Sequence, residues 1–167
     1  NLWHSTTHRY GSPTHAQYYG VEGTFTYNLS ATTPGNLQSP SISLAGFTTP
    51  IALSFNYFLD AEPGFDDASV LVSADGGGTW TRVYDMLPLT WVFVNQTIGI
   101  SAYAGKDILL RFNFNTFDSI ANAYEGWYVD DVKITASVGP PISKVYRNNG
   151  NGTFTDIGAG LPGISGG

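Results

Sequence analysis

Acidic side chains gather in two places along this chain, and their spacing raises the question of a metal ion. The segment DAEPGFDD (60–67) follows a strand-like run, and a pair of aspartates lies inside GWYVDDV (126–132). The two segments contain Asp60, Glu62, Asp66, Asp67, Asp130 and Asp131. No Lys or Arg occurs between Asp60 and Arg82 to offset the first group. If the fold brings both segments together, repulsion between their carboxylates in a low dielectric predicts a bound cation.

Calcium is the cation that suits these donors best. Ca²⁺ takes roughly six to eight oxygen ligands from carboxylates, backbone carbonyls and water in flexible geometry, so an irregular loop facing a strand can supply them. The spacing is not that of an EF-hand loop. The alternative interpretation is that residues 60–67 carry solvated loop charges and that Asp130 or Asp131 bonds neighbouring backbone amides. The residues alone leave both interpretations open.

The strand that carries the second pair of carboxylates must change register. Side chains alternate between the two faces of a strand, so Trp127 and Val129 share one face while Val132 and Ile134 have the opposite parity. All four are of the type found in a core. They can point inward together only if the strand is bulged between Val129 and Val132, where the aspartates lie.

The remaining elements follow from the same alternation. In IALSFNYFL (51–59) and ILLRFNFN (108–115) every second residue is large and apolar, which is typical of half-buried strands. Further strands are predicted at 23–29, 41–44, 68–74, 79–85, 91–98 and 126–135. No window shows a sustained helical period. This pattern predicts an all-β protein with a two-sheet antiparallel β-sandwich of the jelly-roll type.

Composition excludes several classes of function. With a formal net charge of -6 and a pI of about 4.7, the chain has no basic face for nucleic acid. No apolar run approaches the ~20 residues of a membrane span. The absence of cysteine excludes disulfides and thiolate metal sites, and it is compatible with an extracellular bacterial protein. Because the chain begins at Asn1, an export signal removed earlier or an expressed fragment is expected.

Two local patterns mark the organisation of the chain. SADGGGTW (73–80) has the spacing of an Asp-box, which predicts a hairpin turn held by its own hydrogen bonds rather than a glycosidase site. After a first domain at 1–136, SVGPPIS (137–143) is predicted to be a linker because its prolines end the last strand. Beyond it, KVYR and TFTDI in 144–167 are predicted to pair as a hairpin tail.

The order of several motifs resembles a known group of modules. LWH (2–4), YYG (18–20), the Asp-box and GWYVDDV recur with this spacing in the MAM-like, galactose-binding-like jelly-roll modules of bacterial secreted and surface proteins, including immune-inhibitor-A-type peptidases. The resemblance covers roughly residues 1–136. It implies an extracellular bacterial module with structural Ca²⁺ and no catalysis of its own. Carried over position by position, the implied ligands are Glu62, Asp66 and Asp130, with Asp131 as a further candidate. Unlike true MAM domains, this chain has no cysteine, so their animal adhesion role does not transfer.

The tail resembles a second family. VYRNNGNGTFTDIGAGLPG (145–163) is similar to the opening of an FG-GAP or VCBS-type repeat, although the calcium-binding loop that normally follows is missing. No metal is therefore assigned to the tail. Because an unpaired hairpin offers free strand edges, residues 144–167 are a candidate for self-association.

Three functions follow as hypotheses. The first is a non-catalytic, calcium-stabilised extracellular module that binds a glycan or a protein, with Tyr124, Glu125 and Tyr128 near the loop rim as candidate ligand-binding residues. The second is a self-assembling subunit of a filament or surface layer that uses its tail for strand addition. An enzyme of unknown type is the third, but the sequence contains no activated nucleophile motif, and no catalytic residue is assigned.

Overall fold

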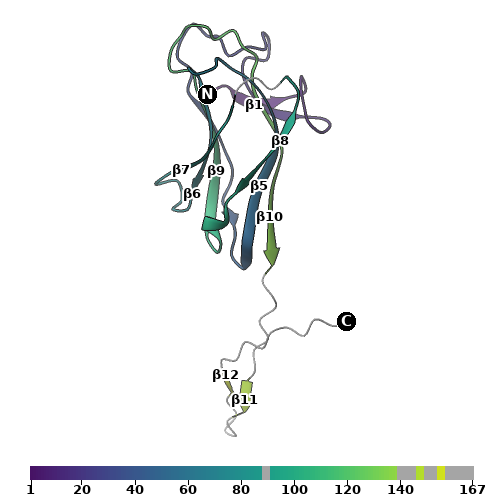
Figure 1. The fold of residues 1–167 in the computed structure, drawn as a ribbon, viewed down its shortest axis with the longest axis vertical. Helices are drawn as coiled ribbons and strands as arrows, with labels where there is room; N and C mark the ends of the chain where they lie inside the picture. The colour runs from purple at the N-terminus through teal and green to yellow at the C-terminus, as the bar shows by residue number, and fades with distance from the viewer. Residues whose placement is uncertain (88–90, 139–145, 149–153, 157–167) are drawn as a thin grey trace. The chain divides into compact units, whose positions relative to one another are not determined.

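A computed structural model describes residues 1–87, 91–138, 146–148 and 154–156 of the chain. The chain divides into two compact units, Asn1–Ser137 and Val138–Gly167. Figure 1 shows the strands of both units along the chain. Among the described residues, no helix is long and apolar enough to cross a membrane.

The regular structure of the larger unit consists of strands apart from one short 3-10 turn. They are β1 (Trp3–Thr6), β2 (Ala16–Tyr19), β3 (Gly35–Gln38), β4 (Ile42–Ser43), β5 (Phe47–Asp60), β6 (Asp67–Ser73), β7 (Thr81–Asp85), β8 (Val94–Gly99), β9 (Asp107–Asn115) and β10 (Gly126–Val138). A single turn of 3-10 helix, η1 (Ser101–Tyr103), precedes β9.

The strands form two facing sheets. One sheet has the order β1-β2-β10-β5-β8, and the other has the order β3-β9-β6-β7, with β4 also paired to β9. The registers of the pairs are antiparallel, for example Tyr57 opposite Val94 and Asp67 opposite Asn115. The two strands predicted from the clearest alternation, β5 and β9, are interior strands of the two sheets. The predicted two-sheet antiparallel β-sandwich is therefore confirmed.

The core lies between the sheets and is rich in aromatic rings. Trp127 is fully buried and contacts Phe112 edge-on, while Phe55 contacts the other side of Phe112. The alternate residues of β5 and β9 that the sequence placed inward are buried in this cluster. Burial of apolar area on this scale is the main source of stability for a sandwich without disulfides.

The predicted register change in β10 is present. Trp127 and Val129 belong to the main core, and Ile134 packs against the same core although its parity is opposite. Asp131 lies between them with a φ of 51°. A non-glycine residue in this left-handed region is uncommon and indicates a local irregularity, which here brings Ile134 to the core side. The inward position expected for Val132 is wrong, because this residue is 47% exposed.

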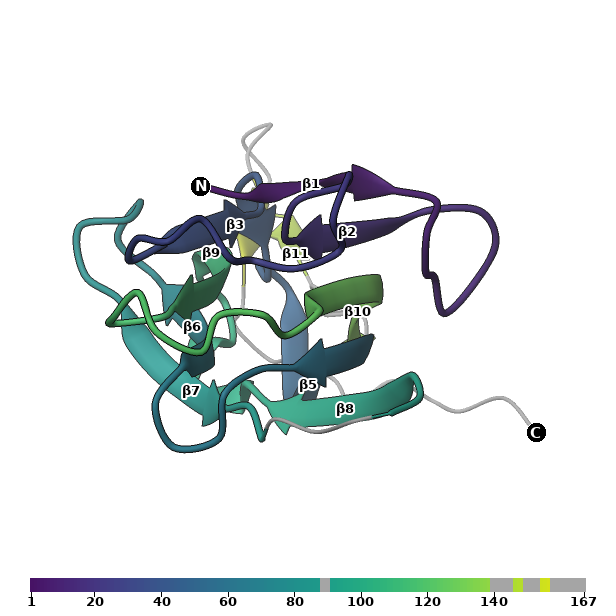
Figure 2. The same cartoon turned by 90° about the horizontal axis from the view of Figure 1, so that it is seen from above.

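Loops gather at one end of the sandwich. The strand pairings show that four strands begin at this end of the sandwich, namely β3, β6, β8 and β10. Four others finish there, namely β2, β5, β7 and β9. We call the described parts of the connecting segments, at 20–34, 61–66, 86–87, 91–93 and 116–125, the loop end. Seen from above in Figure 2, segment 116–125 runs between segment 61–66 and the segment that leads into β3.

The smaller unit contains the predicted hairpin. β11 (Tyr146–Asn148) pairs antiparallel with β12 (Phe154–Asp156), with Arg147 opposite Thr155. The first two residues of the predicted linker at 137–143 belong to β10, and its remainder at 139–143 lies outside the described residues.

Candidate functional site

Asp130 and Asp131 hold a neighbouring loop in the structure. One carboxylate oxygen of Asp130 accepts hydrogen bonds from the backbone N–H groups of Gly11 and Ser12, at 2.8 and 2.9 Å. The carboxylate of Asp131 accepts from Ser12 Oγ and from Asn56 Nδ2, both at 2.6 Å. These contacts are those of the alternative interpretation, in which the two carboxylates bond nearby donors.

Glu62 and Asp66 lie in a different part of the molecule. Asp66 accepts hydrogen bonds through one oxygen, Oδ2, from the Glu62 N–H at 2.8 Å and from the Tyr27 hydroxyl. Its other oxygen, Oδ1, is buried and has no hydrogen-bond partner. Burial raises the pKa of Asp66 because the charged form loses its hydration. A buried carboxylate oxygen without a hydrogen-bond partner is an atom that could serve as a ligand to a bound cation.

The two halves of the predicted metal site are separated along the sheet. Asp60 accepts from the Glu125 N–H at 3.0 Å, whereas Asn56, four residues earlier on β5, contacts Asp131. Four residues of strand span about 13 Å. In the described part of the chain, no group of three or more His, Cys, Asp or Glu is placed to hold a metal ion. Calcium at Glu62 and Asp66 stays a prediction, and the structure does not bring Asp130 and Asp131 to it.

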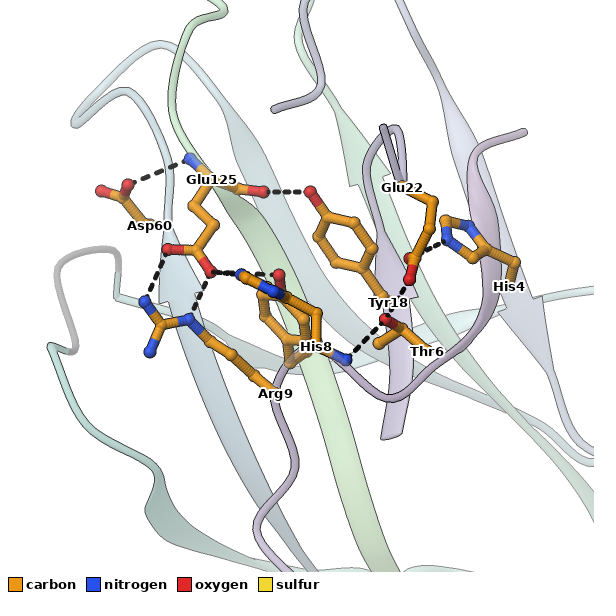
Figure 3. Close-up of polar contacts among 9 residues, drawn as sticks. His4, Thr6, His8, Arg9, Tyr18, Glu22, Asp60 and Glu125 are labelled. Carbon is orange, nitrogen blue, oxygen red and sulfur yellow. Dashed lines mark hydrogen bonds and ion pairs between the residues drawn. The ribbon is translucent and has the colours of Figure 1, made fainter. Parts of the chain in front are cut away.

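Glu125 is the centre of a polar network that Figure 3 shows. Arg9 donates to both carboxylate oxygens of Glu125, through Nε and through Nη2 at 3.0 Å. The Tyr128 hydroxyl donates to the same carboxylate at 3.0 Å, and His8 Nε2 lies 3.6 Å away. The Glu125 side chain is only 18% exposed. Its carboxylate is therefore already occupied by partners from the chain itself.

Segment 7–15 covers a second hydrophobic cluster on the outer face of the β1-β2-β10-β5-β8 sheet. The cluster contains Ala16, Tyr18, Phe58 and Tyr128, all buried, with Phe25 and Phe93 packed against it. Above it, the Arg9 guanidinium lies 4.6 Å from the centre of the Phe58 ring. This covered aromatic face was not predicted, because the contacts between segment 7–15 and the sheet join residues more than 40 positions apart.

Tyr128 is part of this cluster and does not present its ring to solvent. The rings of Tyr18 and Tyr128 stack with their centres 4.3 Å apart, and both residues are fully buried. Burial raises the pKa of both hydroxyls. The Tyr18 hydroxyl donates to the Glu125 carbonyl at 2.7 Å, which Figure 3 also shows. The backbone at the adjacent Gly126 passes very close to β2, since a Cβ on Gly126 would lie 2.2 Å from the Tyr19 carbonyl oxygen.

The other predicted ligand residue, Tyr124, faces the main core. It is half-buried, and its ring stacks with that of Tyr27 at 6.5 Å between centres. Of the three residues predicted to bind a ligand, the structure therefore leaves Glu125 partly exposed and turns both tyrosine rings toward the interior. Their role in ligand binding stays a prediction.

A second polar contact fastens β1 to the loop end. His4 Nε2 lies 2.9 Å from one carboxylate oxygen of Glu22, and Thr6 Oγ1 donates to the other at 2.9 Å (Figure 3). The hydrogen bond with His4 lowers the pKa of Glu22. His4 and His8 thus both contact a glutamate, so the histidines near the start of the chain have partners within the fold.

Exposed apolar side chains concentrate at the loop end. Of the ten large hydrophobic residues of the described chain that are exposed, seven lie there. They are Leu29, Phe65, Leu87, Trp91, Val92, Phe117 and Ile120. Single exposed hydrophobic residues are normal, but a concentration on one face marks an interaction surface.

Phe117 is held at the tip of a rigid turn. The Asp118 N–H donates to the Thr116 carbonyl at 2.6 Å, across Phe117, whose φ is 56°. A three-residue turn with positive φ is rare and strained, and such strain persists where surrounding contacts enforce it. The hydroxyl of Thr116 supplies these contacts, since it accepts from the Thr33 N–H and donates to the Asp118 carbonyl. The ring of Phe117 is nevertheless 63% exposed.

The segments of the loop end carry more negative than positive charge, although Arg9 of segment 7–15 offsets the charge of Glu125. The loop-end segments contain Glu22, Glu62, Asp66, Asp118 and Glu125 and no Lys or Arg. A partner that carries phosphate, sulfate or carboxylate groups would meet like charge there.

The Asp-box forms the local hairpin that its spacing predicts. Asp75 accepts from the Thr79 N–H at 2.9 Å and from the Thr79 hydroxyl at 2.7 Å. Trp80 Nε1 donates to the Gly77 carbonyl at 3.1 Å. The Thr79 hydrogen bonds lower the pKa of Asp75. These contacts satisfy the motif within the turn, which supports its structural role.

The fold and the loop end together define a jelly-roll β-sandwich module with an apolar, acidic rim. No family model matches the chain. Bacillopeptidase F from Bacillus subtilis (strain 168) is 34% identical over 129 residues, which cover 75% of this chain and 8% of that protein. The chain therefore spans a small part of the curated relative that it matches.

Comparison with solved structures finds similarities at low sequence identity. The carbohydrate-binding module TmCBM61, solved in complex with β-1,4-galactotriose, superposes with a TM-score of 0.53 at 14% identity and covers 81% of this chain and 83% of its own. The K2 cleaved adhesin domain of Lys-gingipain has a TM-score of 0.47 at 13% identity, with 77% and 76% covered. The likeness to TmCBM61 shows the fold.

Proposed function

We propose that this chain is a non-catalytic binding module of a larger extracellular bacterial protein, and that it holds a neutral glycan at the loop end. The observation that carries the proposal is the ring of Phe117, which a strained turn held by the Thr116 hydroxyl presents to solvent among other exposed apolar side chains. Jelly-roll sandwiches commonly carry binding sites in the loops that a rigid scaffold positions.

The chemistry of the loop end suits a sugar without charge. Exposed aromatic rings such as Phe65 and Phe117 can pack against the apolar faces of pyranose rings, and pockets that bind small ligands combine such faces with a few polar groups. Carboxylates such as Asp118 can accept hydrogen bonds from sugar hydroxyls. The absence of Lys and Arg from these segments disfavours acidic polysaccharides.

The comparisons support the proposal without fixing the ligand. Bacillopeptidase F places a similar segment within a much longer bacterial protein, which supports a module that is one part of a larger chain. TmCBM61 was solved with a neutral galactan fragment on the same fold. The side-chain contacts support a lack of catalysis, because Glu125 is held by Arg9 and Asp130 by backbone amides.

Calcium belongs to this proposal as a stabilising ion rather than as part of the ligand site. The buried and unpartnered Oδ1 of Asp66, beside Glu62, is the feature that supports it. Asp130 and Asp131 are left out of the proposed ligand set, since their oxygens bond Gly11, Ser12 and Asn56.

Affinity gel electrophoresis tests the glycan proposal. The chain is run through gels that contain β-1,4-galactan, xylan, β-glucan or the acidic polygalacturonate, and retardation by at least one neutral polysaccharide is expected. Phe117→Ala should weaken that retardation about tenfold or more, as expected for loss of a central aromatic anchor. Val132→Ala, which changes an exposed residue away from the loop end, is the matched control. Retardation only by polygalacturonate, or equal retardation of Phe117→Ala, would contradict the proposal.

Self-assembly through the tail is a second candidate function. A two-stranded hairpin is marginally stable in water on its own, so β11 and β12 need a surface to pack against. We propose that a neighbouring copy is one such surface. Size-exclusion chromatography of the full chain and of a 138–167 deletion tests this, because only the full chain should elute as an oligomer.

A further inference from the structure

β10 loses one of its two neighbours close to its start. β2 pairs with β10 only from Trp127 to Val129, whereas β10 continues to Val138. On its other side β10 keeps β5 as a neighbour. Among the strands that the structure describes, none pairs with the β2-side edge of β10 after the bulge. Figure 1 shows β10 running far past β1 toward the end opposite the loops.

This free edge is accessible. Val132 is 47% exposed, and Lys133 and Thr135 are exposed as well. An edge strand presents a row of N–H and C=O groups that can pair with another strand, and natural proteins usually blunt or cover such an edge. Lys133 is the one charged residue between Val132 and Ala136, and a single charge gives this edge little protection against strand pairing.

An apolar groove runs beside the edge. One part, of about 180 Å³, is lined by Leu37, Gln38, Ser39, Ile42, Leu110, Phe112 and Val132. A second part, of about 410 Å³, is lined by Ile42, Ser43, Leu44, Phe47, Ile134, Thr135 and Ala136. Because Ile42 lines both parts, they lie next to each other along β10. The walls of the groove are β10 and the start of β5 on one sheet, and β3, β4, β9 and the segments beside β4 on the other.

The groove opens onto the side of the main core. Ile134 and Ala136 are half-buried and pack against the core, as do Leu37 and Ile42 from the opposite wall. A strand laid along β10 would therefore point every second side chain into the groove and the others to solvent. The groove thus continues the inner face of the sandwich where β2 has ended.

We propose that the Val132–Ala136 edge of β10 binds an extended segment of another polypeptide, which adds as a strand to this sheet. The segment carries apolar side chains at alternate positions, and these side chains fill the groove. A polypeptide is the partner that fits, because only a peptide backbone repeats N–H and C=O groups at the spacing of the edge. Acidic side chains on the outer face of the segment would suit Lys133. This site is separate from the loop end and does not depend on a glycan ligand.

Fluorescence anisotropy with a labelled peptide of sequence EVTITVE tests the proposal. Its three apolar residues alternate with threonine, and its terminal glutamates keep it soluble. Binding to the full chain with a Kd below about 1 mM is expected, and the same peptide N-methylated at its three central residues should bind at least about tenfold more weakly because it loses backbone donors. Hydrogen exchange of the Val132–Ala136 amides should slow when the peptide is present.

Two protein variants locate the site. Val132→Asp places a charge at the mouth of the groove and should weaken peptide binding about tenfold or more. Leu29→Asp changes an equally exposed residue, 51% exposed, at the loop end and should leave peptide binding unchanged. Equal thermal midpoints would show that both variants fold. No binding at about 1 mM, equal binding of the N-methylated peptide, or equal binding of Val132→Asp would overturn the proposal. A dimer that protects these amides without peptide would instead assign the edge to a second copy.

Discussion

Replacement of Arg9 by alanine should destabilise the larger unit through a carboxylate that is left without its main partner. Arg9 is 42% exposed, but Glu125, which it contacts through two nitrogens, is only 18% exposed. After the change, the Tyr128 hydroxyl and the distant His8 remain as partners of that carboxylate. The guanidinium is also lost from the face of Phe58.

The size of the effect follows from how much of this pair is buried. Exposed ion pairs contribute about 0–1 kcal/mol, whereas removal of one partner from a buried pair costs about 3–5 kcal/mol. A pair with one half-exposed and one mostly buried member lies between these limits, at about 2 kcal/mol after allowance for solvent screening. Loss of the cation–π contact adds about 0.5 kcal/mol. We therefore expect Arg9→Ala to reduce the free energy of unfolding by about 2–3 kcal/mol.

Urea denaturation measures this loss directly. The midpoint should fall while the slope m stays constant, because the surface exposed on unfolding is nearly unchanged. A double-mutant cycle with Glu125→Ala should give a coupling energy of about 1.5 kcal/mol or more. Arg9→Lys keeps the charge but not the forked geometry and should fall between wild type and Arg9→Ala. A loss below about 0.5 kcal/mol for Arg9→Ala, or additive single mutants, would show that this network does not hold segment 7–15 to the sheet.

Three further outcomes are expected. Calcium at a hundred-fold excess over its Kd should stabilise the wild-type chain by about 2.7 kcal/mol relative to EDTA. Asp66→Asn should remove most of that difference. Equal melting temperatures with and without EDTA would contradict a bound ion. The pKa of Asp75 is lowered in the fold, so its carboxylate stabilises the fold above pH 3.8, the ordinary pKa, and this contribution is lost as the pH falls. Asp75→Asn should therefore reduce the dependence of stability on pH at acid pH. Melting temperatures between pH 2 and 6 measure this dependence. Deletion of 138–167 should leave the melting temperature of the larger unit unchanged in calorimetry, and a large drop would show that the sandwich needs its tail.

Local patterns in the sequence predicted much of the architecture. Strict alternation located β5 and β9, because side-chain parity on a half-buried strand is set by the residues of that strand alone. The same parity rule predicted the irregularity at Asp131, and the Asp-box predicted a turn whose side-chain hydrogen bonds lie within SADGGGTW. These features depend on neighbours in sequence, and one chain is enough to see them.

The candidate site depended on long-range register, which the sequence does not show. Arg9 and Glu125 are 116 positions apart, and neither lies in a motif that would pair them. Asp66 lies far from Asp131 because Asp66 follows the end of β5, whereas Asp131 contacts Asn56, four residues before that end. Tyr128 is buried because segment 7–15 covers the outer face of a sheet that was expected to face solvent. The only sequence signal for a binding role of Phe117 is that an aromatic residue precedes Asp118 in a loop.

An NMR titration would test the central claim most directly. A ¹⁵N-labelled chain would be titrated with an oligosaccharide from the neutral polysaccharide that retards it most strongly. The account predicts saturable shifts at the amides of Phe65, Phe117 and Ile120, with the outer sheet face and the Val132–Ala136 edge unchanged. Shifts confined to those other surfaces, or no saturable shifts with any neutral oligosaccharide, would contradict a glycan site at the loop end.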